Sequence, residues 1–244
     1  MRVAFLSDIH GNLPALRAAL RAAFQHGAQQ LAVAGDVVGE GPFPNEVVGL
    51  LAEHGVPAVR GNVDRRVLAL EEPPHKLQKR LRRADGKRRK RLDAWTALQL
   101  GTEERAWLAA LPPERELDYE GHRVRLLHGS PLGDTDYVYP SLTTTALRAK
   151  LGDDRPEVLV CGHSHIPFVA RLQGVLVVNC GSVGRPADGD PRGSFALVDF
   201  AGPDAPGGVI VRFVYPVAEL TRALAERAVP GVDPAEFEQG VKRR

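Results

Sequence analysis

Short apolar runs that end in polar residues constrain the fold of this chain most. Residues 3–6, 31–34 and 158–161 are apolar. A single residue separates these runs from Asp8, Asp36 and His163, respectively. Continuous apolar runs of this length are typical of strands covered on both faces. In open α/β sheets the functional site lies outside the carboxyl ends of the strands. The sequence therefore predicts an α/β fold in which these side chains meet at one edge.

Seven polar side chains of this kind carry the donor atoms that a pair of divalent metals needs. They belong to the motifs Asp-x-His, Gly-Asp, Gly-Asn, His-Gly and Gly-His-x-His, and they are Asp8, His10, Asp36, Asn62, His128, His163 and His165. Taken singly, Gly-Asp and Gly-Asn fit ordinary turns, and Asp8 with His10 fits the N-cap region of a helix over residues 13–24. The combination in this order predicts a two-metal hydrolase, because one carboxylate can bridge both ions.

The same motifs resemble those of the calcineurin-like metallophosphoesterases over nearly the whole chain. The matching segments are Ser7-Asp8-Ile9-His10-Gly11-Asn12, Gly35-Asp36, Arg60-Gly61-Asn62-Val63-Asp64, Leu127-His128-Gly129-Ser130-Pro131, Gly162-His163-Ser164-His165 and Asn179-Cys180-Gly181-Ser182-Val183-Gly184-Arg185-Pro186. The chain is most similar to the small bacterial and archaeal phosphodiesterase branch, which includes relatives of diadenosine tetraphosphatase. The resemblance implies an α/β fold with two mixed β-sheets sandwiched between helices, a four-layer αββα arrangement.

The resemblance also implies a ligand set and a reaction. The first metal would be held by Asp8, His10, Asp36 and His165, and the second by Asp36, Asn62, His128 and His163. Mn²⁺ is the expected ion, with Fe, Ni, Zn or Co as alternatives. The implied activity is that of a phosphodiesterase, in which a hydroxide bridging the two metals attacks phosphorus in line. A serine nucleophile is the competing idea, but no Gly-x-Ser-x-Gly elbow is present.

One position departs from the family pattern. Many members have a His after the Gly-Asn pair, where it protonates the leaving group or stabilises the transition state, whereas this chain has Val63. Valine cannot carry a proton. Members of the small branch also often lack this His, so the change indicates a subfamily rather than an inactive enzyme. The expected catalytic residues are then Asn62, Asp64 and His163, with Asp64 supporting its neighbours rather than binding metal.

Substrate contacts are expected from Asn12 and from the loop that follows His128. The loop candidates are Asp134, Asp136 and Tyr137, and a turn stabilised by its own Asp side chains is the alternative. The expected substrate is a small phosphate ester or a nucleotide. Since neither a Rossmann fingerprint nor a Walker loop occurs, the sequence gives no support for a nucleotide cofactor.

Length and periodicity predict one domain over residues 1–244 with an insertion. A chain of 244 residues with 43 % hydrophobic content can bury a full core. After Asp64 the β-type runs stop, and residues 65–111 predict a helical cap, with Gly86 breaking or kinking the helical run. Three pairs of runs in the second half, at 115–127, 168–178 and 194–215, predict hairpins and a largely antiparallel or mixed second sheet.

A basic run lies within the predicted cap. Residues 75–92 carry ten Lys or Arg against one Asp, although the whole chain has a net charge of only +2. Clustered cations can neutralise phosphates, so nucleic acid is a candidate partner. A solvated helix face is the alternative, and few aromatic residues interleave to stack bases. A nuclease or nucleotide-polyphosphate hydrolase is therefore an alternative function.

A non-catalytic scaffold, as in the retromer subunit of the same fold, is the other alternative, and the intact seven-ligand set argues against it. Cys161 and Cys180 lack the spacing of a disulfide framework or a thiolate metal site and indicate a reducing compartment. The N-terminus enters a strand at once, without a signal peptide or a segment long enough to span a bilayer. The sequence thus predicts a cytoplasmic protein that does not contact membranes.

Overall fold

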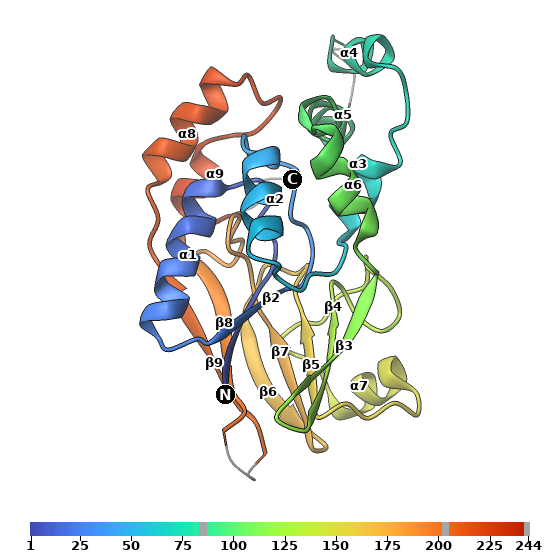
Figure 1. Cartoon of the computed structure of the whole chain (residues 1–244), viewed down its shortest axis with the longest axis vertical. Coiled ribbons are helices and arrows are strands. Elements are labelled where there is room, and N and C mark those ends of the chain that lie inside the picture. The colour runs from blue at the N-terminus through green and yellow to red at the C-terminus, as the bar shows by residue number, and fades with distance from the viewer. Residues whose placement is uncertain (83–86, 202–204, 242–244) are drawn as a thin grey trace.

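Two mixed β-sheets form the centre of the molecule in a computed structural model that describes residues 1–82, 87–201 and 205–241 (Figure 1). The first sheet has the order β2 (Gln30–Val33), β1 (Arg2–Leu6), β8 (Gly193–Asp199) and β9 (Gly207–Phe213). The second has the order β3 (Glu114–Tyr119), β4 (His122–Leu127), β5 (Val158–Cys161), β7 (Val175–Asn179) and β6 (Phe168–Leu172). The predicted fold is therefore confirmed.

Helices cover the outer face of each sheet, which gives four layers. The first sheet is covered by α1 (Leu13–Gln25), α2 (Pro44–Glu53) and α8 (Val217–Glu226), and α9 (Ala235–Gln239) follows α8. Leu16 of α1, Val47 of α2 and Leu220 of α8 are fully buried in the core between these helices and the sheet. On the second sheet, Leu147 and Leu151 of α7 (Thr144–Leu151) pack over Leu159 and Val177.

A separate apolar core holds the two sheets together. Phe5 of β1 meets Tyr119 of β3 and Phe200 edge to face, at ring-centroid distances of 6.0 and 6.5 Å. Such aromatic pairs add roughly 0.5–1.5 kcal/mol each beyond their buried area. In addition, Arg115 of β3 donates to the carbonyl oxygen of Ala58 at 3.0 Å. The facing edges of the two sheets are thereby fixed relative to each other.

The three apolar runs that precede Asp8, Asp36 and His163 do not all belong to one sheet. The apolar run 158–161 becomes β5, which pairs in parallel with β4 and β7 of the second sheet, not with β1 and β2. The C-terminal hairpin β8–β9 instead completes the first sheet by pairing with β1. The sequences of the apolar runs 3–6, 31–34 and 158–161 do not indicate which sheet each strand joins, because these strands are all buried on both faces. The metal-ligand motifs consequently come from both sheets.

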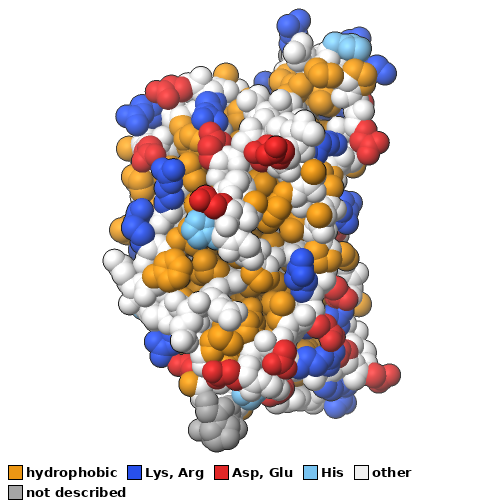
Figure 2. Space-filling view, viewed as in Figure 1, with side chains coloured by type: hydrophobic (Ala, Val, Ile, Leu, Met, Phe, Trp, Pro, Cys, Tyr) orange, Lys and Arg blue, Asp and Glu red, His pale blue; other side chains and the backbone are white. Residues whose placement is uncertain are grey.

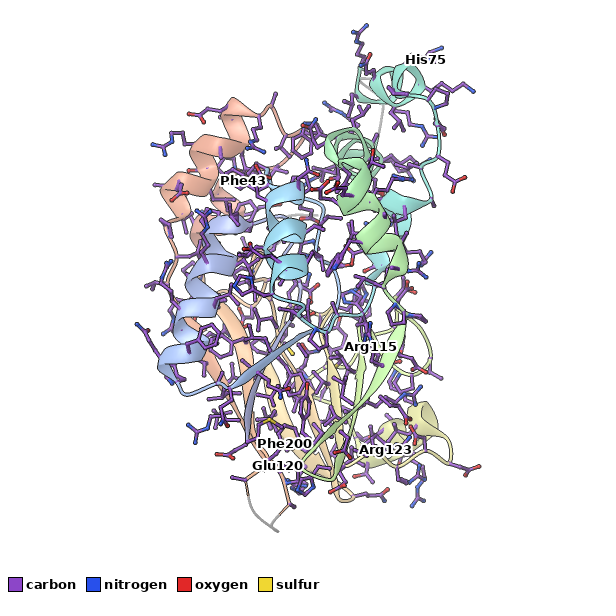
Figure 3. The ribbon with its side chains drawn as sticks, in the orientation of Figure 1. Phe43, His75, Arg115, Glu120, Arg123 and Phe200 are labelled. Atoms are coloured by element: carbon purple, nitrogen blue, oxygen red, sulfur yellow. The ribbon has the colours of Figure 1, made fainter. Side chains whose placement is uncertain are left out.

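Four helices occupy the stretch for which the sequence predicts a cap: α3 (Asn62–Leu68), α4 (Pro74–Arg82), α5 (Arg88–Gln99) and α6 (Thr102–Ala110). Helix α4 packs on α5, and α5 packs on α3. Gly86, the predicted break, lies outside the described residues. Figure 3 shows His75 of α4 at one end of the molecule and Glu120 and Phe200 at the other. Lys and Arg side chains surround the end formed by α4 (Figure 2).

Both cysteines are buried and free. Among the described helices, none combines the length and the apolarity needed to cross a bilayer. The cytoplasmic location and the single-domain organisation remain predictions.

Candidate metal centre

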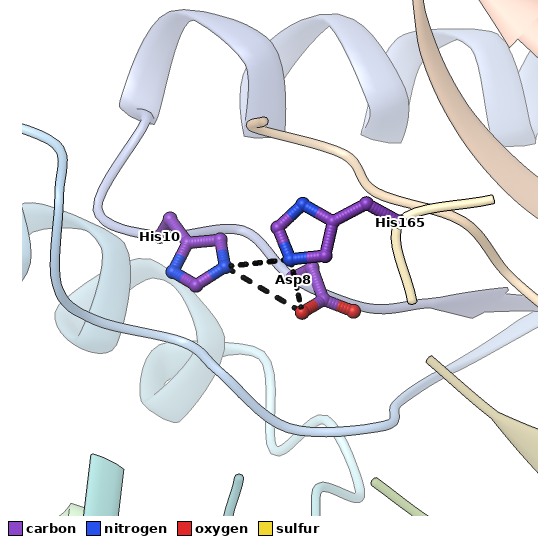
Figure 4. Close-up of side chains that lie close together, drawn as sticks. All are labelled: Asp8, His10 and His165. Carbon is purple, nitrogen blue, oxygen red and sulfur yellow. Dashed lines mark hydrogen bonds and ion pairs between the residues drawn. The ribbon is translucent and has the colours of Figure 1, made fainter. Parts of the chain in front are cut away.

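The first group of predicted ligands is a buried triangle of lone-pair atoms. Asp8 Oδ1 lies 3.1 Å from His165 Nε2 and 3.5 Å from His10 Nε2, and the two histidine nitrogens are 3.3 Å apart (Figure 4). Asp8 and His10 follow β1, whereas His165 follows β5 of the other sheet. Asp8 Oδ1 and His10 Nδ1 are buried without a hydrogen-bond partner. A carboxylate oxygen and two imidazole nitrogens so placed suit a divalent cation.

The rest of the Asp8 carboxylate is fixed by the protein. Its other oxygen, Oδ2, accepts hydrogen bonds from Ser7 Oγ at 2.6 Å and from the backbone N–H of His163 at 2.8 Å. Only Oδ1 is therefore left to face the histidines. Gly162 makes this arrangement possible, because a Cβ there would overlap Ser7 Oγ and Asp8 Oδ2. Glycine at this place keeps the two sheets' loops in close contact.

The hydrogen bonds of two histidines fix which ring nitrogen is free to bind metal. His165 Nδ1 donates to the carbonyl oxygen of Arg185 at 2.5 Å, and His128 Nδ1 donates to that of Ala34 at 2.8 Å. A carbonyl oxygen can only accept, so Nδ1 carries the proton in both rings. The lone pair is left on Nε2, which points into the cluster. Such outer contacts orient metal-binding histidines and raise their basicity.

The second group of ligands lies beside the first. Asp36, His128 and His163 bring one donor atom each within 4.8 Å of one another, as Asp8, His10 and His165 do. Asp36 Oδ2 is 3.4 Å from His128 Nε2 and 3.8 Å from His10 Nε2 of the first group. Its Oδ1 accepts the backbone N–H of Val63 at 2.7 Å. Asp36 therefore presents one oxygen between the two groups, as a bridging ligand would.

Asn62 closes the second group. Its Oδ1 lies 3.1 Å from both His128 Nε2 and His163 Nδ1 and 3.2 Å from Asp36 Oδ2, all of them lone-pair atoms. Without a cation the opposite amide orientation would satisfy more hydrogen bonds, since the nitrogen would then donate to these atoms. With a cation between them, four converging acceptors are the arrangement that binds it. The Asn62 amide thus fits a metal ligand.

Five of the seven predicted ligands have left-handed backbone conformations. The φ angles lie between 51° and 63° at Asp8, His10, Asp36, His163 and His165. Residues other than glycine rarely adopt positive φ, and such positions cost roughly 1–3 kcal/mol each. Strain of this kind persists only where the surrounding structure imposes it and is concentrated at functional sites. The backbone strain thus marks the same residues as the motifs do.

The pKa values show how strongly the cluster is charged. Burial disfavours the protonated ring of His128, but the carboxylates of Asp36 and Asp8 outweigh it and raise the pKa of His128 to about 10. Burial and the neighbouring His128 lower the pKa of His163 to about 4. Although burial opposes ionisation, the histidines hold the pKa of Asp8 well below its ordinary value and lower that of Asp36 to about 2. Two carboxylates therefore stay ionised in a buried space.

Asp64 joins the loop after β2 to the start of α3. Its fully buried carboxylate accepts backbone N–H groups of Gly61 at 2.9 Å, Val37 at 3.2 Å and Val38 at 3.0 Å. Burial and the charge of Asp36 raise the pKa of Asp64 to about 6. This geometry agrees with a supporting role beside Asp36 and Asn62. Val63 is 5 % exposed, packs over Gly39 and lines the pocket above the predicted ligands.

A pocket of about 300 Å³ opens over the ligands. It is lined by predicted ligands from both groups, by Arg185 of the last family motif, and by residues that the motifs did not indicate: Glu40, Arg66, Arg88, Arg89, Leu92 and Asp93. Arg66 could have been found from its position one helical turn after Asn62, and Arg185 from its own motif. No sequence signal links the pocket to Glu236 of α9, whose buried carboxylate accepts from Arg88 at 2.8 and 2.6 Å and contacts Arg185.

The four predicted substrate contacts are in different places. Tyr137 lines the pocket and stacks on His163 at a ring-centroid distance of 4.4 Å. Asn12 is fully buried, where it caps α1 by accepting the N–H of Ala15 at 3.0 Å and donates to the carbonyl oxygen of Gly184 at 2.9 Å. Its amide is thus already satisfied within the protein and does not face the pocket.

Two acidic candidates of the loop are paired with cations of the chain. Asp134 binds Arg65 at 2.6 and 3.0 Å and lines a second pocket, which His128 also lines. Asp136 contacts Lys150 and Ser130. Neither acid lines the pocket over the metal ligands, because each is held by a nearby donor. A substrate role for these two residues stays a prediction.

Known proteins resemble this chain over most of its length. A family model described as the calcineurin-like phosphoesterase superfamily domain matches residues 1–202. An uncharacterized protein of Methanocaldococcus jannaschii is 30 % identical over 214 residues, covering 81 % of this chain and 82 % of the relative. The phosphodiesterase YfcE of Escherichia coli is 29 % identical over 211 residues, covering 82 % of this chain and 88 % of YfcE.

A solved structure agrees with the same assignment. The crystal structure of a metallophosphoesterase from Sphaerobacter thermophilus has a TM-score of 0.81 and 26 % identity, with 99 % of each chain covered. Fold, ligand clusters and sequence similarity are thus consistent, and the chain belongs to the calcineurin-like phosphoesterase superfamily, within its small bacterial and archaeal branch.

Proposed function

We propose that the protein is a phosphodiesterase that works with two divalent metals. The first would be held by Asp8, His10, Asp36 and His165, and the second by Asp36, Asn62, His128 and His163. The observation that carries this proposal is the pair of buried donor groups with the Asp36 carboxylate between them. The similarity to YfcE, which is described as a phosphodiesterase, supports the choice of a diester over a monoester.

When bound, two divalent ions would supply a hydroxide nucleophile at neutral pH and would offset charge on the phosphoryl oxygens. The chain's own residues hold the donors in place: Ser7 and the His163 N–H orient Asp8, and carbonyl oxygens orient His128 and His165. Val63 contributes only its N–H, which holds Asp36. The leaving group therefore departs without a proton donor at this position. We expect Mn²⁺ at the site, because the ligands are carboxylate, amide and imidazole groups without a thiolate.

The two alternative functions, a nuclease and a non-catalytic scaffold, make different demands on the chain. A nuclease would use the basic run, and two of its described cations are engaged within the chain, Arg80 with Glu72 and Arg88 with Glu236. A scaffold would need no ligands, whereas all seven ligand positions are retained and clustered. The phosphodiesterase proposal accounts for more of the buried donors than either alternative does.

Metal stoichiometry and a substrate panel test the proposal together. Asp36→Asn should weaken both metal sites, whereas His165→Ala should chiefly weaken one, so the two variants should differ in bound Mn²⁺ per chain. The parent should hydrolyse a phosphodiester, lose this activity on prolonged chelation and regain it with Mn²⁺. An oligonucleotide in the same panel tests the nuclease alternative. Full activity of thoroughly chelated protein would disprove the metal mechanism.

A further inference from the structure

Four charged side chains beside the pocket form a chain of alternating sign. They are Glu40 of the loop after β2, Arg185, Glu236 of α9 and Arg88 of α5. Arg185 contacts Glu40 through Nη1 and Glu236 through Nη2. Glu236 in turn accepts hydrogen bonds from Nη1 and Nη2 of Arg88 at 2.8 and 2.6 Å. The Glu236 side chain is fully buried and that of Arg185 is 2 % exposed, so salt and water screen their contact little.

The Arg185 end of this chain of charges reaches the first group of predicted metal ligands. The carbonyl oxygen of Arg185 accepts the hydrogen bond of His165 Nδ1 at 2.5 Å. The backbone N–H of Arg185 donates to Ser182 Oγ at 2.7 Å, and that hydroxyl donates to the carbonyl oxygen of Asp8 at 2.7 Å. The place of Arg185 therefore influences two ligands of the same group, one directly and one through a serine.

The Arg88 end belongs to the helical cap. Arg88 is the first residue of α5 and lines the pocket, and its guanidinium binds Glu236 by two parallel hydrogen bonds. Such a forked pair fixes direction as well as distance. The side chain also passes close to the loop before α9, because a Cβ at Gly231 would lie 3.2 Å from Arg88 Cγ. The first turn of α5 is thus joined to the C-terminal part of the chain.

Helix α9 is anchored by contacts other than the Glu236 carboxylate. Phe237, the next residue, is 2 % exposed and belongs to the apolar core under α1, α2 and α8. The Arg185 guanidinium lies 5.7 Å from the centre of the Phe237 ring. Gly240, which ends the helix with a φ of 62°, accepts the N–H of Gly189 at 2.9 Å. Glu236 is therefore a fixed point between two arginines.

We propose that Glu236 is a positioning residue that ties the cap to the first metal group, so that α5 and the His165 ligand keep one relative position. This inference rests on the proposed two-metal function, and it concerns a residue beyond the family match, which ends at residue 202. One carboxylate binds two planar, rigid guanidinium groups, so breaking either contact loosens the other arginine. Because coupling between two sites is reciprocal, metal held by the first group should in turn hold the cap.

The first test measures both Mn²⁺ affinities of Glu236→Gln by calorimetry. The amide oxygen can still accept hydrogen bonds, but the NH₂ group faces a guanidinium, donor against donor. The Kd of the first site should rise ~10–100-fold, as is typical when an outer contact of a metal ligand is lost. The Kd of the second site should change less than about threefold, because the carbonyl oxygen of Ala34 orients His128. His165→Ala, which should chiefly weaken the first site, identifies the affected Kd.

Electron paramagnetic resonance gives a spectroscopic form of the same test. With two equivalents of Mn²⁺, the parent should show an exchange-coupled pair of ions, and Glu236→Gln should show isolated ions. Hydrogen exchange reports the cap end: bound Mn²⁺ should slow the exchange of α5 amides in the parent and have no such effect in the variant. A residue that only stabilised the fold would change neither the balance between the two metal sites nor the response of α5 to metal.

Arg88→Ala separates positioning from charge and keeps Glu236 paired with Arg185. Removing a positive charge from the pocket favours a cation electrostatically, so an effect of charge alone would lower the Kd of the first Mn²⁺. Loss of positioning should instead raise this Kd, by ~10-fold on the scale of outer contacts. The two explanations therefore predict opposite signs. If Glu236→Gln does not fold, the sign measured for Arg88→Ala decides between them.

Asp154→Asn is the matched control, because Asp154 also bridges two arginines, Arg123 at 2.6 Å and Arg125 at 3.0 Å. Arg123 lies at the opposite end of the molecule from α4 of the cap (Figure 3). This control should keep both Kd values. Unchanged or equally changed Kd values in Glu236→Gln, or a lower first Kd in Arg88→Ala, would overturn the inference and leave the two-metal proposal standing. A parent that shows no coupled pair at any Mn²⁺ loading would overturn both.

Discussion

Asp64 allows a sharp test of how the chain supports its ligands. Its carboxylate binds three backbone N–H groups on the two loops that carry Asp36 and Asn62, and it is itself fully buried. In Asp64→Asn one oxygen becomes an NH₂ group. If the remaining oxygen keeps the N–H groups of Gly61 and Val37, the new NH₂ faces the N–H of Val38, donor against donor. The substitution thus removes one hydrogen bond to a charged group and leaves a donor unsatisfied.

The size of the effect follows from that one bond. A hydrogen bond to a charged group is worth about 1.5–3 kcal/mol, and this is a factor of roughly 10–150 in an equilibrium constant. Loss of a residue that orients metal ligands typically weakens metal binding ~10–100-fold, which is the same range. We therefore expect Asp64→Asn to raise the Kd for Mn²⁺ by ~10–100-fold. Removing the negative charge of Asp64, which lies beside Asp36, should also raise the Kd for Mn²⁺.

The assay is calorimetric titration of metal-free protein with Mn²⁺ at pH 8, above the pKa of about 6 at Asp64, so that the parent carries the carboxylate. Asp118→Asn is the control, because Asp118 also accepts a backbone N–H, that of Gly121 at 3.0 Å, in an exposed hairpin turn. The melting temperature of the metal-free protein reports stability separately. An unchanged Kd with a lowered melting temperature would refute the role of Asp64 in positioning ligands and leave it only a role in stability.

Two further predictions concern the leaving group and the glycine beside Asp36. Because Val63 supplies no proton, kcat/KM of the parent should fall steeply as the pKa of the leaving group rises, and a flat dependence would show that another group protonates it. A Cβ at Gly61 would overlap the carboxylate and backbone nitrogen of Asp36, so Gly61→Ala should abolish metal binding measured by atomic emission. Gly49→Ala in α2 is the control, because a Cβ there meets nothing within 4 Å, and it should stabilise the protein by ~0.5–1 kcal/mol. Equal metal content of the two variants would contradict the prediction for Gly61.

The sequence predicted the layers and the ligands better than it predicted the pocket. Five of the predicted ligands sit beside glycines, which marks them in the sequence, but their division into two metal groups was implied by the family resemblance. Helices were expected between Asp64 and β3, where α3–α6 lie. In contrast, the assignment of β5 to the second sheet depends on pairing with β4 and β7, and equally apolar strands carry no label for their partners.

Pocket residues were missed because distant contacts decide their roles. The buried carboxylate of Glu236 holds Arg88 of the cap and Arg185 of the loop that orients His165, across 148 and 51 residues of sequence. Asp134 and Asp136 illustrate the reverse case: acidic loop residues close to His128 in sequence are held by Arg65 and Lys150 instead of lining the metal pocket. The spacing of charged residues could not distinguish a pocket wall from an internal ion pair.

The backbone at the ligands explains why so much of the chain is needed to build the centre. Five predicted ligands have left-handed φ angles, and at ~1–3 kcal/mol each their combined cost is ~5–15 kcal/mol, as large as the whole stability of a typical domain. Motif residues alone cannot offset this cost. Two sheets, three apolar cores and the hydrogen bonds of Asp64 offset it, so the loops are already shaped before any cation binds. The same seven residues in a short peptide would lack the packing that imposes these conformations, and they would therefore not form the two donor groups.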